Sequence, residues 1–200
     1  MRIRVKYIVP LLLFFACSVV GAADLATGVS ALDRGDYGVA LKEFRTLADQ
    51  GDARAQYRLG TLFAMGRGVR RSYTEAAYWL NKAAAQGNAH AQNDLGVLYE
   101  LGRGVPVDPK DAGRWFRKAA KQGIGAAQLS LASLYREGRG VPLDPIEAFA
   151  WANAATQFGE PEAQQLLDSV AKEMGPEQIN KAERRAKQYV ALYVAPFRQY

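Results

Sequence analysis

The sequence predicts an all-α solenoid in which short helix pairs stack side by side, and three observations lead to this fold class. A 36-residue unit recurs along the chain, and its copies at 87–122 and 123–158 are identical at 16 of 36 positions. Each copy contains two stretches with helical spacing of apolar residues, and a glycine turn separates them. Self-similarity at this period is typical of stacked repeats, which present an extended surface to a partner rather than a pocket to a substrate.

The first 23 residues have the layout of a secretory signal peptide. Arg2, Arg4 and Lys6 form a positive region, and an apolar run and small residues follow it up to Ala23. The run is too short to cross a membrane. We expect residues 1–23 to be removed, which leaves a periplasmic or secreted protein without a transmembrane helix. The single cysteine, Cys17, lies in a poor context for lipid attachment, so a lipoprotein is the less favoured alternative.

Each repeat, at 51–86, 87–122 and 123–158, is predicted to form two helices. In the second repeat the first helix runs from about Ala89 to Leu101, and Gly102 ends it in the left-handed conformation. Asp108 caps the next helix, with Pro109 at its first position. The same signals recur in the other repeats, as Gly66-Arg67-Gly68-Val69 with a capping box at 72–75, and as Gly138-Arg139-Gly140-Val141 with Asp144-Pro145.

A buried stripe centred on tryptophan is predicted on the second helix of each repeat. Its members stand three and four residues apart, so they share one helix face. They are Ala76, Trp79 and Ala83, then Ala112, Trp115 and Ala119, then Ala148, Trp151 and Ala155. Because the stripe recurs at one repeat position, we expect these tryptophans to pack in the core rather than to stack on a ligand.

The sequence of the repeat also resembles a known family of repeats. The segment 91–123 follows the pattern Ala-Gln-x-x-Leu-Gly-x-x-Tyr, Gly-x-Gly-Val and Asp-x-x-x-Ala-x-x-Trp-x-x-Lys-Ala-Ala-x-Gln-Gly, which is similar to Sel1-like repeats. The resemblance covers 51 to about 171. It implies the fold of these relatives of the tetratricopeptide repeats, an α/α right-handed superhelix of antiparallel helix pairs.

The flanking segments depart from the repeat pattern. Residues 24–50 resemble a tetratricopeptide-like helix pair, while 159–175 keep Gly159 and Ala163-Gln164 but lack the Gly-x-Gly-Val turn, as a partial fourth repeat would. Residues 176–200 are interpreted as a charged C-terminal capping helix and tail. An atypical, polar last unit is what an open-ended stack needs to stay soluble.

Composition excludes several function classes. The mature chain has no cysteine for disulfides, and its net charge falls from +6 to about +3 without the signal peptide. No basic block accompanies this charge, so we expect no nucleic-acid partner. His90 is the only histidine and has no Cys or His partner for a metal, and no serine stands in a nucleophile motif. We therefore predict no catalytic residue, no metal and no cofactor.

Two surfaces remain as candidate binding sites. In the tetratricopeptide family the first helix of each pair lines a concave face that holds an extended peptide or a helix. Carried over by position, this resemblance gives Arg54, Tyr57 and Thr61, then His90, Asn93 and Val97, then Leu129, Ser133 and Arg136. Asn93 stands where related repeats place an asparagine that clamps a peptide backbone. We expect Tyr57, His90 and Asn93 to form a binding patch.

The second surface is the edge formed by the glycine turns, where Arg67, Arg103 and Arg139 recur in register. The turn requires its glycines for their positive φ but does not require arginine. A row of guanidinium groups could hold an acidic partner or an anionic polymer by paired hydrogen bonds, in a salt-sensitive manner.

The interpretation that best fits these residues is an exported Sel1-like repeat scaffold that binds a protein or peptide partner, acidic if the turn edge is used. It would act in the bacterial envelope or outside the cell. Two alternatives stay open. One is an envelope hydrolase related to Sel1-like proteins that carry a β-lactamase name, although those relatives pair cysteines that this chain lacks. The other is a lipid-anchored assembly factor for envelope or polysaccharide export.

Overall fold

The computed structural model describes residues 24–198, and the regular structure in this range is helical. The predicted signal peptide, with Cys17, lies outside the described residues. The helices are α1 (Leu25–Asp33), α2 (Tyr37–Asp49), α3 (Ala53–Met65), α4 (Tyr73–Ala85), α5 (Ala89–Leu101), α6 (Pro109–Ala120), α7 (Gly125–Glu137), α8 (Pro145–Thr156), α9 (Ala163–Lys172), α10 (Pro176–Tyr193) and the 3₁₀ turn η1 (Ala195–Phe197). Across 24–198, none of them is long and apolar enough to span a membrane.

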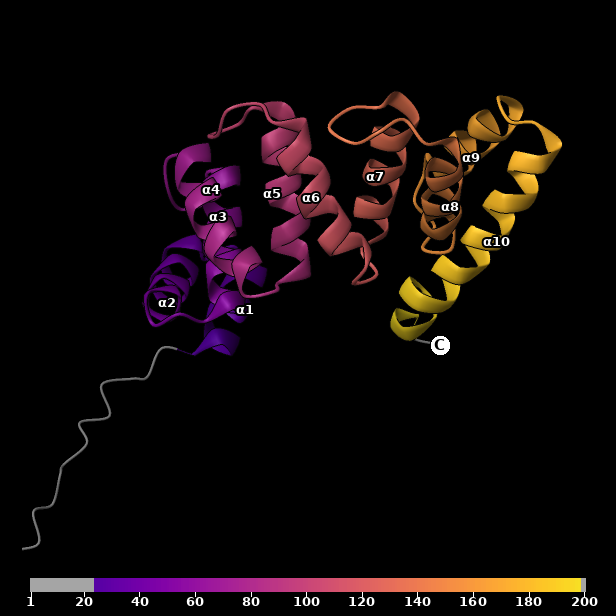
Figure 1. The fold of residues 1–200 in the computed structure, drawn as a ribbon. Helices are drawn as coiled ribbons and strands as arrows, with labels where there is room; N and C mark the ends of the chain where they lie inside the picture. The colour runs from indigo at the N-terminus through magenta and orange to yellow at the C-terminus, as the bar shows by residue number, and fades with distance from the viewer. Residues whose placement is uncertain (1–23, 199–200) are drawn as a thin grey trace, which may run out of the picture.

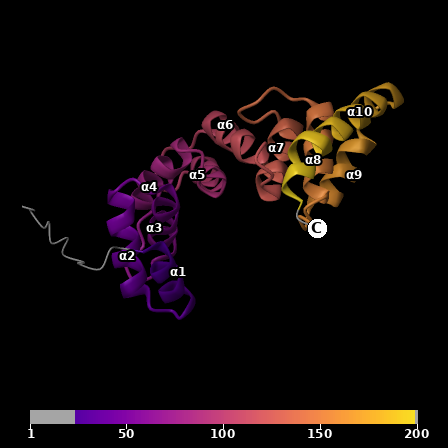
Figure 2. The ribbon, with the colours of Figure 1, turned by 90° about the horizontal axis from the view of Figure 1, so that it is seen from below.

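The helices stack in chain order into a curved array, each packing on the next as far as α9 (Figure 1). Seen from below, α1, α3, α5 and α9 lie along the inner side of the curve, and α2, α4 and α6 lie along its outer side (Figure 2). We call these sides the concave face and the convex face. The predicted all-α solenoid of helix pairs is confirmed.

The predicted helix ends are confirmed as well. Gly66, Gly102 and Gly138 close α3, α5 and α7 in the left-handed conformation, with φ of 70°, 64° and 66°. The Asp108 carboxylate accepts the N–H groups of the first turn of α6 at 2.9 and 3.0 Å, and Pro109 follows it. Ser72 accepts the N–H of Glu75 at 3.3 Å, which is one half of the predicted capping box.

The second glycine of each turn has a packing reason that the sequence alone did not supply. Each turn reaches back to the second helix of the preceding unit. An added Cβ would lie 2.8 Å from the carbonyl oxygen of Tyr37 at Gly68, 2.2 Å from that of Tyr73 at Gly104, and 2.1 Å from that of Pro109 at Gly140. A side chain is therefore excluded where one unit contacts the next.

The core is built from alanine and leucine in two clusters, one spanning α1–α5 and the other α6–α10. Trp79 and Trp151 are buried, as predicted, but Trp115 is only partly buried, and this prediction is corrected. The neighbouring Phe116 takes the fully buried place, where it fills the space left by Gly96 of α5. The Trp115 ring lies nearer the surface, with the ammonium of Lys118 4.1 Å from its centroid.

A ladder of buried glutamines links consecutive repeats. Gln56 and Gln92 each donate to a carbonyl eight residues earlier, at 3.1 Å. Each also accepts a 2.8 Å hydrogen bond from the glutamine that ends its own repeat, Gln86 or Gln122. Gln128 repeats the first bond, but Phe158 stands where the next donor would be, and the side-chain oxygen of Gln128 has no partner among the described residues. The ladder therefore ends in the third repeat.

The C-terminal helix folds back instead of extending the stack. Helix α10 packs against α8, where the rings of Tyr189 and Tyr193 lie 4.3 and 5.4 Å from that of Trp151. The carbonyl of Tyr193 accepts a 3.3 Å hydrogen bond from Gln128, and the Phe197 ring covers Gly123. The last helix thus closes the end of the array and contacts the start of the third repeat.

Candidate concave binding site

The concave face brings Tyr57 of α3 and His90 of α5 together, as the predicted patch requires. Their rings stack with centroids 5.8 Å apart and an interplanar angle of 29°. His90 is exposed and Tyr57 is partly buried, so the pair offers one open aromatic surface between two neighbouring repeats. Such a surface can pack against the stem of a partner side chain.

The side chain of Asn93 is hydrogen-bonded to the carboxylate of the next residue, Asp94. Its amide nitrogen donates to Oδ1 of Asp94 at 3.1 Å, while its oxygen is buried and accepts no hydrogen bond within the described range. Burial raises the pKa of the Asp94 carboxyl above the ordinary value, against the lowering effects of the Asn93 hydrogen bond and of nearby His90. A backbone clamp by Asn93 stays a prediction; the contact with Asp94 uses one of its two amide N–H groups.

A small cavity of about 230 Å³ lies beside Asp94, between α3, α4 and α5. Its walls are mostly apolar and include Leu80, Val97 and Leu98, and Thr61 and Arg103 also line it. In residues 24–198 no cation lies within ion-pair distance of Asp94, and Arg103 instead lies over the Tyr73 ring, 5.4 Å from its centroid. The cavity therefore combines an apolar wall with a carboxylate whose charge is not balanced by a direct contact.

Sequence reasoning missed Asp94. The carry-over from tetratricopeptide repeats selected the positions of His90, Asn93 and Val97 on this helix and passed over the residue between them. A signal was present, because the equivalent positions in the neighbouring repeats hold Arg58 and Ser130, and only this repeat has an acid there. Its partial burial, however, depends on the packing of α3 against α5.

The other predicted concave residues do not join this site. Arg54 is exposed and pairs with Asp52, the cap of its own helix, at 3.5 Å. Ser133 donates to the carbonyl of Leu129, and Arg136 forms a 2.8 Å ion pair with Glu173. Ser133 and Arg136 line a separate hollow of about 240 Å³ between α7 and α9.

The arginines of the turn edge have a structural contact. The guanidinium groups of Arg67 and Arg103 lie over the rings of Tyr37 and Tyr73, 5.6 and 5.4 Å from the centroids. The third repeat has Pro109 in place of the tyrosine, and Arg139 binds Glu100 at 2.9 Å instead. These contacts between units account for arginine at this position, while binding of an acidic partner at the turn edge stays a prediction.

Three further carboxylates have structural roles at helix N-termini. Asp108 and Asp144 cap α6 and α8, as the sequence predicted. Glu147 lies in the first turn of α8, where it also binds Arg185 and accepts a 2.7 Å hydrogen bond from the Tyr189 hydroxyl. Within 24–198 no group of three His, Cys, Asp or Glu side chains is placed to hold a metal ion.

A curved stack of helix pairs with small hollows along its inner side defines the class, a helical-repeat solenoid. Comparison with known proteins narrows the class to a family. The Sel1 repeat matches residues 53–88, 89–124 and 125–157, two residues later than the frame set by the opening glycines. The chain belongs to the Sel1 repeat family.

Two solved structures support this assignment. One is c5321, a protective antigen present in uropathogenic Escherichia coli strains and displaying an SLR fold, with 35% identity and a TM-score of 0.74 over 84% of this chain and 37% of that one. The other is a Sel1 repeat protein from Oxalobacter formigenes, with 31% identity and a TM-score of 0.71 over 84% of this chain and 68% of that one. No curated protein matches the sequence. Sel1 repeat folds are typically scaffolds for protein interaction and are generally non-enzymatic.

Proposed function

We propose that this protein is an exported scaffold that holds a segment of a partner protein at the cavity between α3, α4 and α5. Residues 1–23 would direct export to the periplasm or beyond, because they combine a positive start, an apolar run and small residues. The proposed organisation is an N-terminal helix pair at 24–50, repeats at 51–86, 87–122 and 123–158, a partial repeat at 159–175 and a capping helix and tail at 176–200.

The observation that carries the binding proposal is the Asp94 carboxylate beside its apolar cavity. A partly buried charge without a direct counter-ion lowers stability, so its presence favours a role in binding. The cavity is smaller than the pockets that hold drug-sized ligands, and it suits one side chain of a bound segment. A lysine or arginine would place its cation at Asp94 and its stem along Val97 and the stacked rings of Tyr57 and His90.

Site-specific photocrosslinking in cells tests this assignment. A photoreactive amino acid at position 57 should capture a defined partner, and one at Tyr78, which is 52% exposed on α4, should not. The Asp94→Asn variant should reduce that capture at least about tenfold, whereas Asp49→Asn at the end of α2 should leave it unchanged. Equal capture from both positions, or capture that is insensitive to Asp94→Asn, would contradict binding of the partner at the concave site.

Export is tested separately by mass spectrometry of the mature N-terminus. The proposal expects a free amino group at Ala23 or Asp24 in a periplasmic or secreted fraction. An acylated Cys17 would instead establish the lipid-anchored alternative, and an intact Met1 in the cytoplasm would contradict export.

A further inference from the structure

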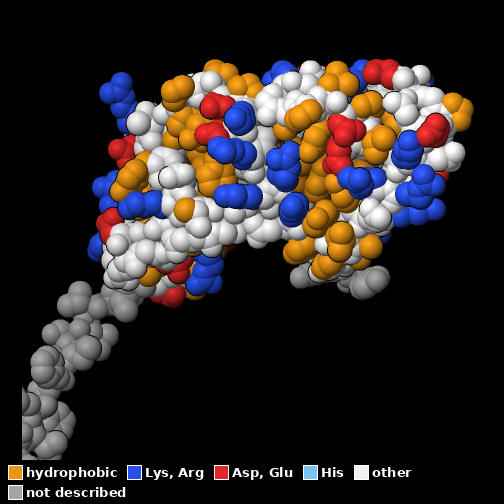
Figure 3. Space-filling view, viewed as in Figure 1, with side chains coloured by type: hydrophobic (Ala, Val, Ile, Leu, Met, Phe, Trp, Pro, Cys, Tyr) orange, Lys and Arg blue, Asp and Glu red, His pale blue; other side chains and the backbone are white. Residues whose placement is uncertain are grey.

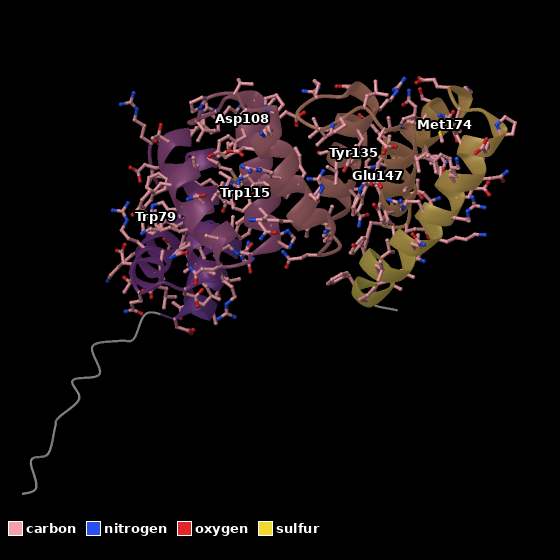
Figure 4. All side chains as sticks on the ribbon, in the orientation of Figure 1. Trp79, Asp108, Trp115, Tyr135, Glu147 and Met174 are labelled. Carbon is pink, nitrogen blue, oxygen red and sulfur yellow. The ribbon has the colours of Figure 1, made fainter. Side chains whose placement is uncertain are left out.

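The convex face holds a further hollow that none of the predicted sites includes. It has a volume of about 410 Å³ and lies where α6, α7, α8 and α10 meet. Arg117 and Lys121 line it from α6, Tyr135 from α7, Trp151 from α8 and Tyr193 from α10. Figure 4 labels two further reference points of this region, Tyr135 and Glu147, which lie close together between α6 and α10.

One wall of the hollow contains a buried hydrogen-bond donor without an acceptor. Trp151 is 2% exposed, and its indole Nε1 has no partner among the described residues. A buried N–H that loses its water without gaining an acceptor destabilises the folded state. The great majority of buried polar groups are paired, so this unpaired donor at a hollow points to an acceptor supplied by a ligand.

The side of the hollow formed by α6 is positively charged. Basic residues recur along the outer face of this helix: Lys110, Arg114, Arg117, Lys118 and Lys121. Within 24–198 only Arg114 of this group forms an ion pair, with Asp111. Arg117 donates to the Tyr135 hydroxyl at 2.7 Å, and Lys121 at the end of the helix is exposed. Figure 3 shows Lys and Arg side chains gathered at the centre of this face, beside an apolar strip.

The two acids that line the same hollow are already engaged. Glu147 is bound by Arg185 and by the Tyr189 hydroxyl. Asp144 accepts the N–H groups of Ile146 and Glu147 at 2.9 and 3.1 Å, which fixes it as the cap of α8. Two cations of the lining, Arg117 and Lys121, have no ion pair among the described residues, and the indole N–H of Trp151 is an unpaired donor buried in the wall of the hollow.

We propose that this hollow binds a carboxylate side chain of an acidic segment in a partner protein. A carboxylate is planar and accepts several hydrogen bonds at once, which matches a guanidinium and an indole donor at one site. The rest of the segment would follow the basic row of α6, and this would make association sensitive to salt. The site is separate from the cavity between α3, α4 and α5 and does not depend on it.

Titration of the 15N-labelled protein with the blocked peptide acetyl-(Glu-Ser)₄-amide tests the site by NMR. The indole N–H signals are assigned with Trp→Phe variants. We expect the Trp151 signal to move in a saturable way while that of Trp79 stays, and acetyl-(Gln-Ser)₄-amide to have no effect. Lys121→Gln and Arg117→Gln should each weaken binding about tenfold. Lys110→Gln, at the other end of α6, should weaken it less than about twofold.

Three outcomes would overturn the proposal. Equal shifts with the glutamate and glutamine peptides would show that no carboxylate is recognised. An equal loss in Lys110→Gln and Lys121→Gln, or a Trp115 signal that moves as far as that of Trp151, would show general attraction to a basic face. An unmoved Trp151 signal at saturating peptide would show that the hollow is not the site, and none of these results would bear on capture at position 57.

Discussion

The contacts between repeats differ at the two ends of the array. At the first two turns an arginine lies over a tyrosine ring of the preceding unit. In the first two repeats a pair of glutamines also joins the first helix to the end of the second. At the third turn Pro109 replaces the tyrosine, Arg139 binds Glu100, and Phe158 replaces the glutamine donor. What stays the same throughout is the second glycine of each turn and its contact with the preceding backbone.

This difference separates two kinds of repeated residue. The glycine contact leaves no room for an alternative side chain, so it persists in all three turns. The arginine and glutamine contacts are attractive interactions that other groups can supply. In the third repeat an ion pair with Glu100 and contacts with helix α10 take their place. Repetition of a residue therefore identifies a structural role, but only the absence of space makes that residue irreplaceable.

The largest effect is expected where α10 replaces the missing contacts. Trp151→Ala removes a ring that is 2% exposed and packed against Tyr189 and Tyr193. We expect the free energy of unfolding in urea to fall by about 3–5 kcal/mol. The equivalent Trp115→Ala removes a partly buried ring and should cost about 1–2 kcal/mol. Equal losses would mean that α10 adds nothing to the burial of Trp151.

The second glycine of the turn should tolerate substitution equally poorly in the second and third turns. Gly104→Ala and Gly140→Ala place a methyl group 2.2 and 2.1 Å from a backbone oxygen, at φ of 73° and 69°. Strain and overpacking together should lower the free energy of unfolding by about 3 kcal/mol in each. Gly87→Ala is the matched control, because its φ is 92° but the space beside it is open, and it should cost about 1 kcal/mol. A control as damaging as the other two would assign the effect to backbone strain alone.

The glutamine ladder should contribute less. Gln92→Ala leaves the Ala84 carbonyl with backbone N–H donors alone and Gln122 without its acceptor. We expect a loss of about 1–3 kcal/mol, measured by urea unfolding. Gln164 stands at the same repeat position beyond the end of the ladder, where it is exposed and bonds only Asp168 among the described residues. Gln164→Ala should change stability by less than about 0.5 kcal/mol, and a comparable loss there would contradict a ladder that stops in the third repeat.

The smallest predicted effect is a gain in stability rather than a loss, and it follows from substitution of Asp94. Its pKa is raised by burial, so the folded state holds the proton more tightly than the unfolded state. The free energy of unfolding should therefore decrease as the pH rises from the ordinary aspartate pKa of 3.8 through the raised folded value. Asp94→Asn removes this loss and should raise the melting temperature at pH 7. A lower melting temperature at pH 7 in the variant would show that the ionised carboxylate is stabilising.

Sequence reasoning worked where a residue acts on the backbone within a few residues of itself. Gly102, Asp108 and Pro109 determine helix ends locally, and the predicted bounds of α5 agree with the structure. It failed where the outcome depends on contacts distant in sequence. Trp115 repeats the pattern of Trp151, but only the latter is covered, by a helix about 40 residues further along. The same limit applies to Asp94, whose burial depends on α3, and to the hollow beside α6, which α10 helps to form.

The direction of the glutamine bonds also determines where this array can lengthen by duplication. In the first and second repeats one glutamine amide donates to the preceding unit and accepts a hydrogen bond from the glutamine that ends its own repeat. A further 36-residue copy inserted after residue 122 would bring both amides with it and leave the bonds on either side intact. A copy added after residue 158 would meet Phe158 and displace the helix that is folded over Trp151. A duplication after residue 122 would thus preserve the glutamine contacts, whereas one after residue 158 would separate α10 from the ring of Trp151 that it now covers.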